Sequence, residues 1–287
     1  MARKNIFQLV DESYDIQNEI IKISTLFELE YYFNMEDGDY TFKSLVEEEL
    51  FYDWKFRGTC VTVKEYLERA QADISPHTVR WNSLPEKIII NYLEVLENFI
   101  LLLNNNAEYL SEEYGCTCYS TFNSVFIDLI NTLEKKLGLT TRTMDGRVLL
   151  YPENATLEKA IESCEDEDVQ WEMIRYVREK LGLSEKRKVL TELGNHIEPI
   201  LKSRALQKAG YNQLESDVGF MLNNFHVRHN NKVGAKAQDY IVSLNDTQLE
   251  EWYDKLYNAI LAVIIINDHI PTQQNVANLK KTYTWRS

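Results

Sequence analysis

The chain has 287 residues, of which 44% are hydrophobic and 26% are charged, and this composition excludes an intrinsically disordered protein. Its formal net charge of −14 at pH 7 excludes a surface that is basic overall, so a nucleic-acid site would have to be a local patch. Ten glycines and five prolines are few for this length, and so little turn chemistry favours helices over many short strands.

The N-terminal sequence MARKNIFQLVDESYD has no apolar core of the kind found in signal peptides. The longest apolar runs, at 88–90, 99–103 and 259–266, are shorter than the roughly 20 residues that cross a bilayer. We therefore expect a cytoplasmic protein without a membrane partner. The four cysteines do not have the spacing of a metal site, and we expect free thiols.

Apolar residues recur at helical spacing through much of the first half of the chain. Thr62 followed by Glu65 has the pattern of a helix-capping box, and Gly138 is a suitable residue for a helix end. We expect region 1–138 to be a helical unit of unknown role that offers a surface to a protein partner. Its predicted helices cover residues 5–33, 44–51, 63–72, 85–103 and 120–137.

Residues 140–152 have the pattern of a small β-hairpin. Asp145-Gly146 is a favoured two-residue turn, and β-branched and aromatic residues flank it. We expect this hairpin to connect two domains, with the connector covering 139–153.

The second half of the chain returns to helical periodicity. We expect a helical domain over 154–270 and a polar tail over 271–287, and a bend at Pro199. The predicted fold class is all-α, a mainly helical bundle with one small β-hairpin near 140–152. The predicted helices of this half cover 156–164, 169–181, 185–209 with Ser184 as its cap, a segment that opens at Asn212, and 247–266.

The segment 219–232, GFMLNNFHVRHNNK, concentrates polar chemistry beside an apolar helix face. If it is helical, Leu222, His226 and His229 share one face, where burial and neighbouring charge can tune a histidine across neutral pH. The alternative is a helix end, where His and Arg side chains bind the last carbonyls. Two histidines three residues apart also resemble metal ligands, but no third ligand is near and Arg228 would repel the cation, so we expect no metal.

Residues 154–266 resemble the helical HEPN-type domains of abortive-infection and toxin proteins, a family that takes part in antiviral defence. That family carries Arg, a polar residue, a short spacer and then His. Here Asn224 occupies the polar position and His229 the position of the histidine, while Asn223 stands where the family has its arginine. The segment 187–202 is similar to the long helix that precedes the motif.

The resemblance implies a metal-independent ribonuclease that acts as a homodimer on RNA and needs no cofactor. His229 would be the general base or acid, Arg228 would hold the phosphate, and Asn223 and Asn224 would orient these groups. His226 would be a second proton-transfer group.

The residues expected to bind phosphate or RNA are Lys232, Asn230 and Asn231. Because Asn cannot supply the charge of the family's arginine, a second hypothesis stays open. It describes a non-catalytic helical interaction protein that serves as a sensor, a scaffold or the regulatory partner of a defence effector.

Overall fold

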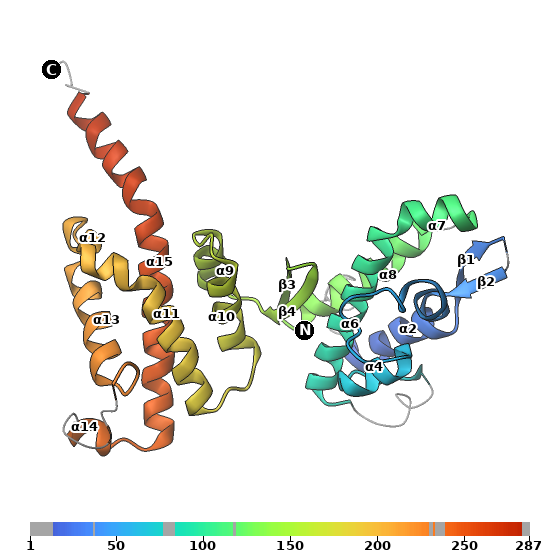
Figure 1. Ribbon diagram of the computed structural model, residues 1–287, viewed down its shortest axis with the longest axis horizontal. Coiled ribbons are helices and arrows are strands. Elements are labelled where there is room, and N and C mark those ends of the chain that lie inside the picture. The colour runs from blue at the N-terminus through green and yellow to red at the C-terminus, as the bar shows by residue number, and fades with distance from the viewer. Residues whose placement is uncertain are drawn as a thin grey trace, which may run out of the picture. The chain divides into compact units, whose positions relative to one another are not determined.

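The computed structural model describes residues 14–36, 38–76, 84–116, 119–229, 232 and 239–282. In these ranges the protein is mainly helical with two small antiparallel sheets of two strands each, which confirms the predicted fold class. The chain forms two compact units, residues 1–150 and residues 151–287. The division between them falls inside the segment predicted as a connector, and Figure 1 gives the labels of the elements.

Unit 1 combines helices with both small sheets. Its last strand, β4, crosses the division between the units. In chain order its elements are α2 (Ile16–Glu28), β1 (Tyr31–Met35), β2 (Gly38–Thr41), α3 (Phe42–Leu45), the π-helical turn η1 (Val46–Leu50), α4 (Val63–Arg69), α6 (Glu86–Asn105), α7 (Ala107–Tyr114), α8 (Tyr119–Lys136), β3 (Leu139–Met144) and β4 (Arg147–Pro152).

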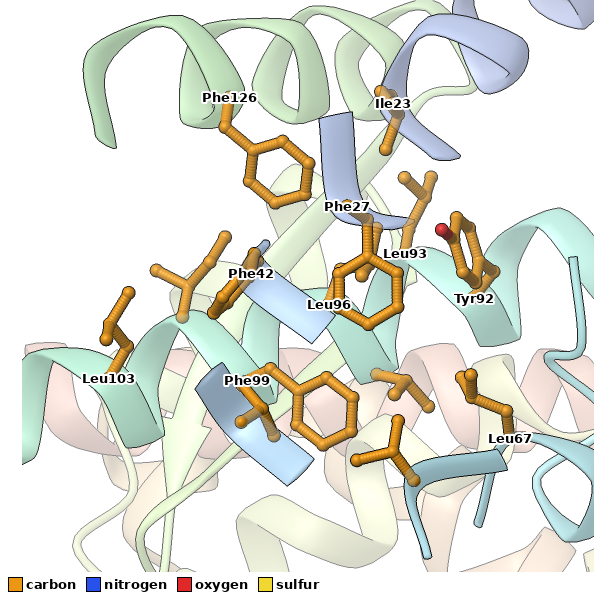
Figure 2. Close-up of a cluster of buried hydrophobic side chains, with 14 of the residues drawn as sticks. Ile23, Phe27, Phe42, Leu67, Tyr92, Leu93, Leu96, Phe99, Leu103 and Phe126 are labelled. Atoms are coloured by element: carbon orange, nitrogen blue, oxygen red, sulfur yellow. The ribbon is translucent and has the colours of Figure 1, made fainter. Parts of the chain in front are cut away.

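Helix α6 is the centre of the core of unit 1. Phe27 of α2 stacks on Phe99 of α6, with ring centroids 6.1 Å apart, and Phe42 of α3 meets Phe126 of α8 edge to face at 5.6 Å (Figure 2). By length and composition alone α6 could cross a membrane, but half of its apolar window is buried inside the protein. The core packing of α6 therefore accounts for its apolar sequence.

The start of the chain differs from the sequence-based prediction, because a helix was expected as far as residue 33. Helix α2 instead ends at Glu28, and the chain forms the antiparallel pair β1–β2, with Phe33 opposite Tyr40. Along β1 the side chains alternate, so that Phe33 and Met35 are buried. This period of two, carried by aromatic residues, stabilises a strand better than a helix.

The hairpin β3–β4 confirms the second β prediction, and its turn lies at Asp145 and Gly146 as expected. Both residues have positive φ, 48° and 72°, which is the geometry of the tightest hairpin turns. The Asn98 side chain of α6 both accepts from the Val148 N–H (3.0 Å) and donates to the Val148 carbonyl (2.8 Å). These bonds continue the edge of the sheet onto α6, so the hairpin is fixed to unit 1.

Two carboxyl groups lie in the interior of unit 1, Glu97 on α6 and Glu134 on α8. The Oε1 atom of Glu134 is buried and has no hydrogen-bond partner among the described residues. Burial raises the pKa of Glu97, and burial together with the charge of Glu97 raises the pKa of Glu134 to about 8. Glu134 is therefore protonated at neutral pH.

Apart from the last two residues of β4, unit 2 is built from helices within the described residues. They are α9 (Ala155–Glu162), α10 (Glu167–Arg178), α11 (Leu183–Ser203), α12 (Ala205–Lys208), α13 (Asn212–Asn224), α14 (Asp239–Val242) and α15 (Asp246–Thr282).

Helix α15 is the common support of unit 2, because α9, α11, α12 and α13 all pack against it (Figure 1). The Tyr257 ring of α15 stacks on Tyr176 of α10 with centroids 4.1 Å apart, and its hydroxyl donates to the Met173 carbonyl at 2.7 Å. Lys186 of α11 pairs with Asp254 of α15 at 2.8 Å. These contacts hold three helices in one arrangement.

Two helices of unit 2 have bounds that differ from the prediction. Gly182, not Ser184, precedes the first turn of α11, and the helix ends at Ser203 because Arg204 takes a left-handed conformation (φ 56°). Helix α15 does not stop near residue 266 but continues through Pro271 to Thr282. Residues 271–281, which lie in the region predicted as a polar tail, are thus helical and exposed.

Helices α11 and α13 approach each other closely at Gly194. A Cβ atom at this position would lie 2.7 Å from the Leu222 side chain, which is fully buried. A Cβ at Gly219, in contrast, would meet nothing within 4 Å. The absence of a side chain at Gly194 therefore sets the distance between the two helices.

The first prediction concerns Glu134. The pKa of Glu134 rises from 4.5 to about 8 on folding, so its proton stabilises the folded chain at low pH, and this stabilisation is lost as the pH rises from 4.5 to about 8. We expect the free energy of unfolding to fall by up to about 1.4 kcal/mol per pH unit across this window, and Glu134→Gln to flatten that fall. Urea denaturation at several pH values measures it.

Asp128→Asn, on the exposed face of the same helix, is the control and should leave the pH dependence as it is in the wild type. An unchanged slope in Glu134→Gln would contradict the assignment of this proton.

The second prediction compares two glycines in helices of unit 2. Gly194→Ala should destabilise the protein by about 1–3 kcal/mol, because the added methyl group displaces Leu222 from a filled core. Gly219→Ala should stabilise it by about 0.4–1 kcal/mol, since the site is open and alanine reduces the entropy of the unfolded chain. Thermal and urea unfolding of the two variants test the opposite signs.

Candidate functional site

The segment 219–232 is not one continuous helix. Helix α13 ends at Asn224, and His226 takes a left-handed conformation with φ 61°. The Arg228 N–H then donates to the Leu222 carbonyl at 3.1 Å, a bond that spans six residues and turns the chain back over the helix end. The predicted shared helical face of Leu222, His226 and His229 is therefore wrong, because the helix stops before His226.

Two apolar side chains anchor the turn that follows α13. Phe225 and Val227 are buried, and the Phe225 ring lies against Trp252 of α15 with centroids 4.6 Å apart. Burial of residues 225 and 227 leaves the intervening His226 and the following Arg228 at the margin of the core. The predicted position of the histidine at the core edge thus arises from a turn instead of a helix.

The two asparagines bind their own helix. The Asn223 side chain donates to the Gly219 carbonyl and the Asn224 side chain to the Phe220 carbonyl, each at 2.9 Å. Both bonds reach back four residues along α13, the usual local bond of a short polar side chain in a helix. In this arrangement neither amide donates toward His229.

Arg228 binds α11. Its Nη2 atom donates to the Gly194 carbonyl at 2.9 Å and lies 3.9 Å from the Glu198 carboxylate, and its side chain is only 18% exposed. The Glu198 carboxylate also pairs with Lys202 at 2.9 Å. The guanidinium group therefore connects the turn to α11 and is already bonded on two sides.

The remaining predicted residues fall into two groups. His229 is half-buried, and Lys232 lies 3.9 Å from the Asp246 carboxylate. Asn230 and Asn231, predicted to bind phosphate or RNA, lie outside the described residues.

A small pocket of about 190 Å³ opens beside the turn, and of the predicted residues that the structure describes, His226 and Lys232 line it. Its other lining residues are Leu183, Ser184 and Arg187 from the start of α11, and Leu249 and Tyr253 from α15. The Nε atom of Arg187 donates to the Val227 carbonyl at 3.2 Å, which fixes the guanidinium group at the pocket. Three basic side chains, Arg187, His226 and Lys232, thus line one small pocket.

The electrostatic environment of His226 reflects these neighbours. Burial lowers its pKa, the positive charges of Arg187 and Lys232 lower it further, and a hydrogen bond to the His229 backbone acts in the opposite direction. His226 is therefore neutral at pH 7. A neutral imidazole between two cations can accept a proton and lies in a locally positive field.

Arg187 and Tyr253 are among the pocket residues that the sequence analysis did not identify as site residues. Arg187 belongs to the segment 187–202, which was recognised only as a long helix. The sequence carries no direct signal for its role, because the start of α11 meets the turn after α13 only in the folded unit.

Comparison with known proteins gives no relative. No family model, no curated protein and no solved structure matches this chain. Within the described residues, no group of three or more His, Cys, Asp or Glu side chains lies together so that it could hold a metal ion.

The third prediction tests Arg228 as a structural contact. Arg228→Gln should destabilise unit 2 by about 1–2 kcal/mol, because it breaks a largely buried, charge-assisted bond to the Gly194 carbonyl. Lys202→Gln removes the other partner of Glu198, but on the exposed surface, and should change stability by less than about 0.5 kcal/mol. Urea denaturation compares them, and equal effects would contradict the structural role of Arg228.

Proposed function

We propose that this chain is a non-catalytic helical interaction protein, a sensor, scaffold or regulatory partner of a cytoplasmic defence effector. The observation that carries the proposal is the bonding of Arg228. A ribonuclease of the HEPN-like kind would need a cationic group free to meet the phosphate, and Arg228 donates to Gly194 and faces Glu198 instead. The bonds of Asn223 and Asn224 within α13 support the same reading.

The exposed end of α15 supports an interaction role and a homodimer. Residues 271–281 are helical yet exposed, and Val276 and Leu279 are 43% and 57% exposed. These two side chains are three residues apart and so lie on one face of the helix. An apolar pair on a projecting helix is a surface that a second copy of the chain can cover.

A second candidate function, a metal-independent ribonuclease, is favoured by one observation. His226 is neutral at pH 7 and lies in one pocket with Arg187 and Lys232, which is a suitable environment for a general base next to a phosphate. In this alternative His226, and not His229, takes the proton of the ribose hydroxyl. Arg187 then supplies the positive charge that Asn223 lacks.

The fourth prediction separates these functions with purified full-length protein and total RNA in the presence of EDTA. We expect the wild type to leave the RNA intact, as measured by gel electrophoresis over time. EDTA-resistant cleavage would contradict the non-catalytic proposal. In that case His226→Asn and His229→Asn identify the base, since loss of a general base costs about 10²–10⁴-fold in rate. Asn tolerates the positive φ of residue 226.

A second arm of the same experiment measures assembly by sedimentation. The double variant Val276→Glu/Leu279→Glu should weaken self-association at least about tenfold, because it places charge in an apolar contact. The control Gln274→Glu/Asn278→Glu adds the same charge to the same exposed helix and should change association less. A wild type that stays monomeric at all concentrations would contradict the homodimer.

A further inference from the structure

The pocket beside the turn is positively charged in a protein whose net charge is −14. Arg187 and Lys232 line it together with His226. Two carboxylates lie near its rim. Glu185 accepts from the Gly182 N–H at 3.0 Å, and Asp246 lies 3.9 Å from Lys232 with its side chain 84% exposed. Asp246 offsets part of the charge of Lys232, but no carboxylate among the described residues pairs with Arg187, so the pocket keeps a positive potential at Arg187.

Arg187 has hydrogen-bonding capacity left over at this pocket. Of its five N–H donors only the Nε group has a partner among the described residues, the Val227 carbonyl, and no carboxylate there pairs with the guanidinium group. The Nε bond fixes the plane of the group while its two terminal nitrogens remain available. A guanidinium group held in this way is suited to bidentate binding of an oxyanion.

Tyr253 provides an independent observation. The residue is 1% exposed and it lines the pocket. Burial raises the pKa of this hydroxyl to about 12 and the charge of Arg187 lowers it, so the two groups lie close together. A ligand oxygen in the pocket would accept a hydrogen bond from this hydroxyl.

The first turn of α11 completes the set of donors. Leu183 and Ser184 lie in the first turn of a helix of 21 residues, where backbone N–H groups have no partner within the helix and the helix dipole is positive. The Ser184 hydroxyl adds a further donor at the rim.

We propose that this pocket binds the phosphate group of a small phosphomonoester, with Arg187, Tyr253, Lys232 and the start of α11 as the donors. The inference goes beyond the proposed function, because a helical interaction protein does not need an anion site. It assigns roles to Arg187 and Tyr253 and links the first turn of α11 to α15 through a ligand.

The size of the pocket selects this ligand class. Pockets for complete drug-sized ligands span about 300–1,000 Å³, so a space of about 190 Å³ holds one tetrahedral group and leaves the rest of the molecule outside. A long RNA backbone would need many cationic contacts, and the net charge of −14 opposes it. Donors from several directions also match the several oxygens of a terminal phosphate better than the two oxygens of a carboxylate.

The fifth prediction is tested by calorimetry on the full chain with inorganic phosphate and with AMP, and adenosine as the unphosphorylated control. We expect phosphate and AMP to bind one site per chain and adenosine not to bind. Tyr253→Phe should weaken binding severalfold, because it removes one donor at the pocket, and it changes the volume of this buried side chain little. Tyr257→Phe, on the same helix, removes a hydroxyl that bonds the Met173 carbonyl and should leave binding unchanged.

Arg187→Gln should weaken binding at least about tenfold, the loss expected for a charged hydrogen-bond donor. Its matched control is Lys188→Gln, which removes the same charge from the next, exposed position of α11 and should have little effect. Circular dichroism melts confirm that the variants fold. The proposal is overturned if neither phosphate nor AMP binds saturably, or if both bind equally well to Arg187→Gln and Tyr253→Phe.

Binding of an RNA oligonucleotide with a 5′-hydroxyl, without binding of phosphate or AMP, would also overturn it and would assign the pocket to a nucleic-acid backbone. These outcomes are separate from the test of the proposed function, because phosphate binding requires neither RNA cleavage nor self-association.

Discussion

The contact between Gly194 and Leu222 determines how the second unit is organised. Because residue 194 has no side chain, α13 packs close to α11, and the turn after α13 comes within hydrogen-bonding distance of that helix. Arg228 then reaches the Gly194 carbonyl and Arg187 reaches the Val227 carbonyl. The glycine at position 194 thus allows two arginines to bind across the turn. Arg228 makes a structural hydrogen bond, and Arg187 lines the pocket.

The sequence was sufficient where short-range chemistry decides the structure. The hairpin β3–β4 was predicted from Asp145-Gly146, whose positive φ angles are local requirements of the turn, and the helical class followed from periodicity and few turn residues. The sequence was not sufficient where contacts between residues far apart in the chain determine the structure. Residues 31–35 follow directly on a helical pattern in the sequence, and their pairing with β2 selects the strand.

Contacts between distant residues also limited the prediction of the site, and more strongly than that of the fold. His226 and Lys232 were recognised, and both lie at one pocket, but the role given to Arg228 assumed a helix that in fact ends at Asn224. Arg187 is nearly 40 residues away from the turn in sequence and could not be connected to it by spacing.

The length of α15 has a geometric consequence of its own. Tyr253, on the wall of the pocket, and Val276, on the exposed end, belong to one continuous helix. At 1.5 Å per residue the two positions are about 35 Å apart along a single rod. Helix α15 therefore sets the distance between the pocket and the exposed apolar pair. A partner bound at Val276 lies at a set distance from the pocket. A rotation of α15 about its own axis would move Tyr253 and Val276 through the same angle.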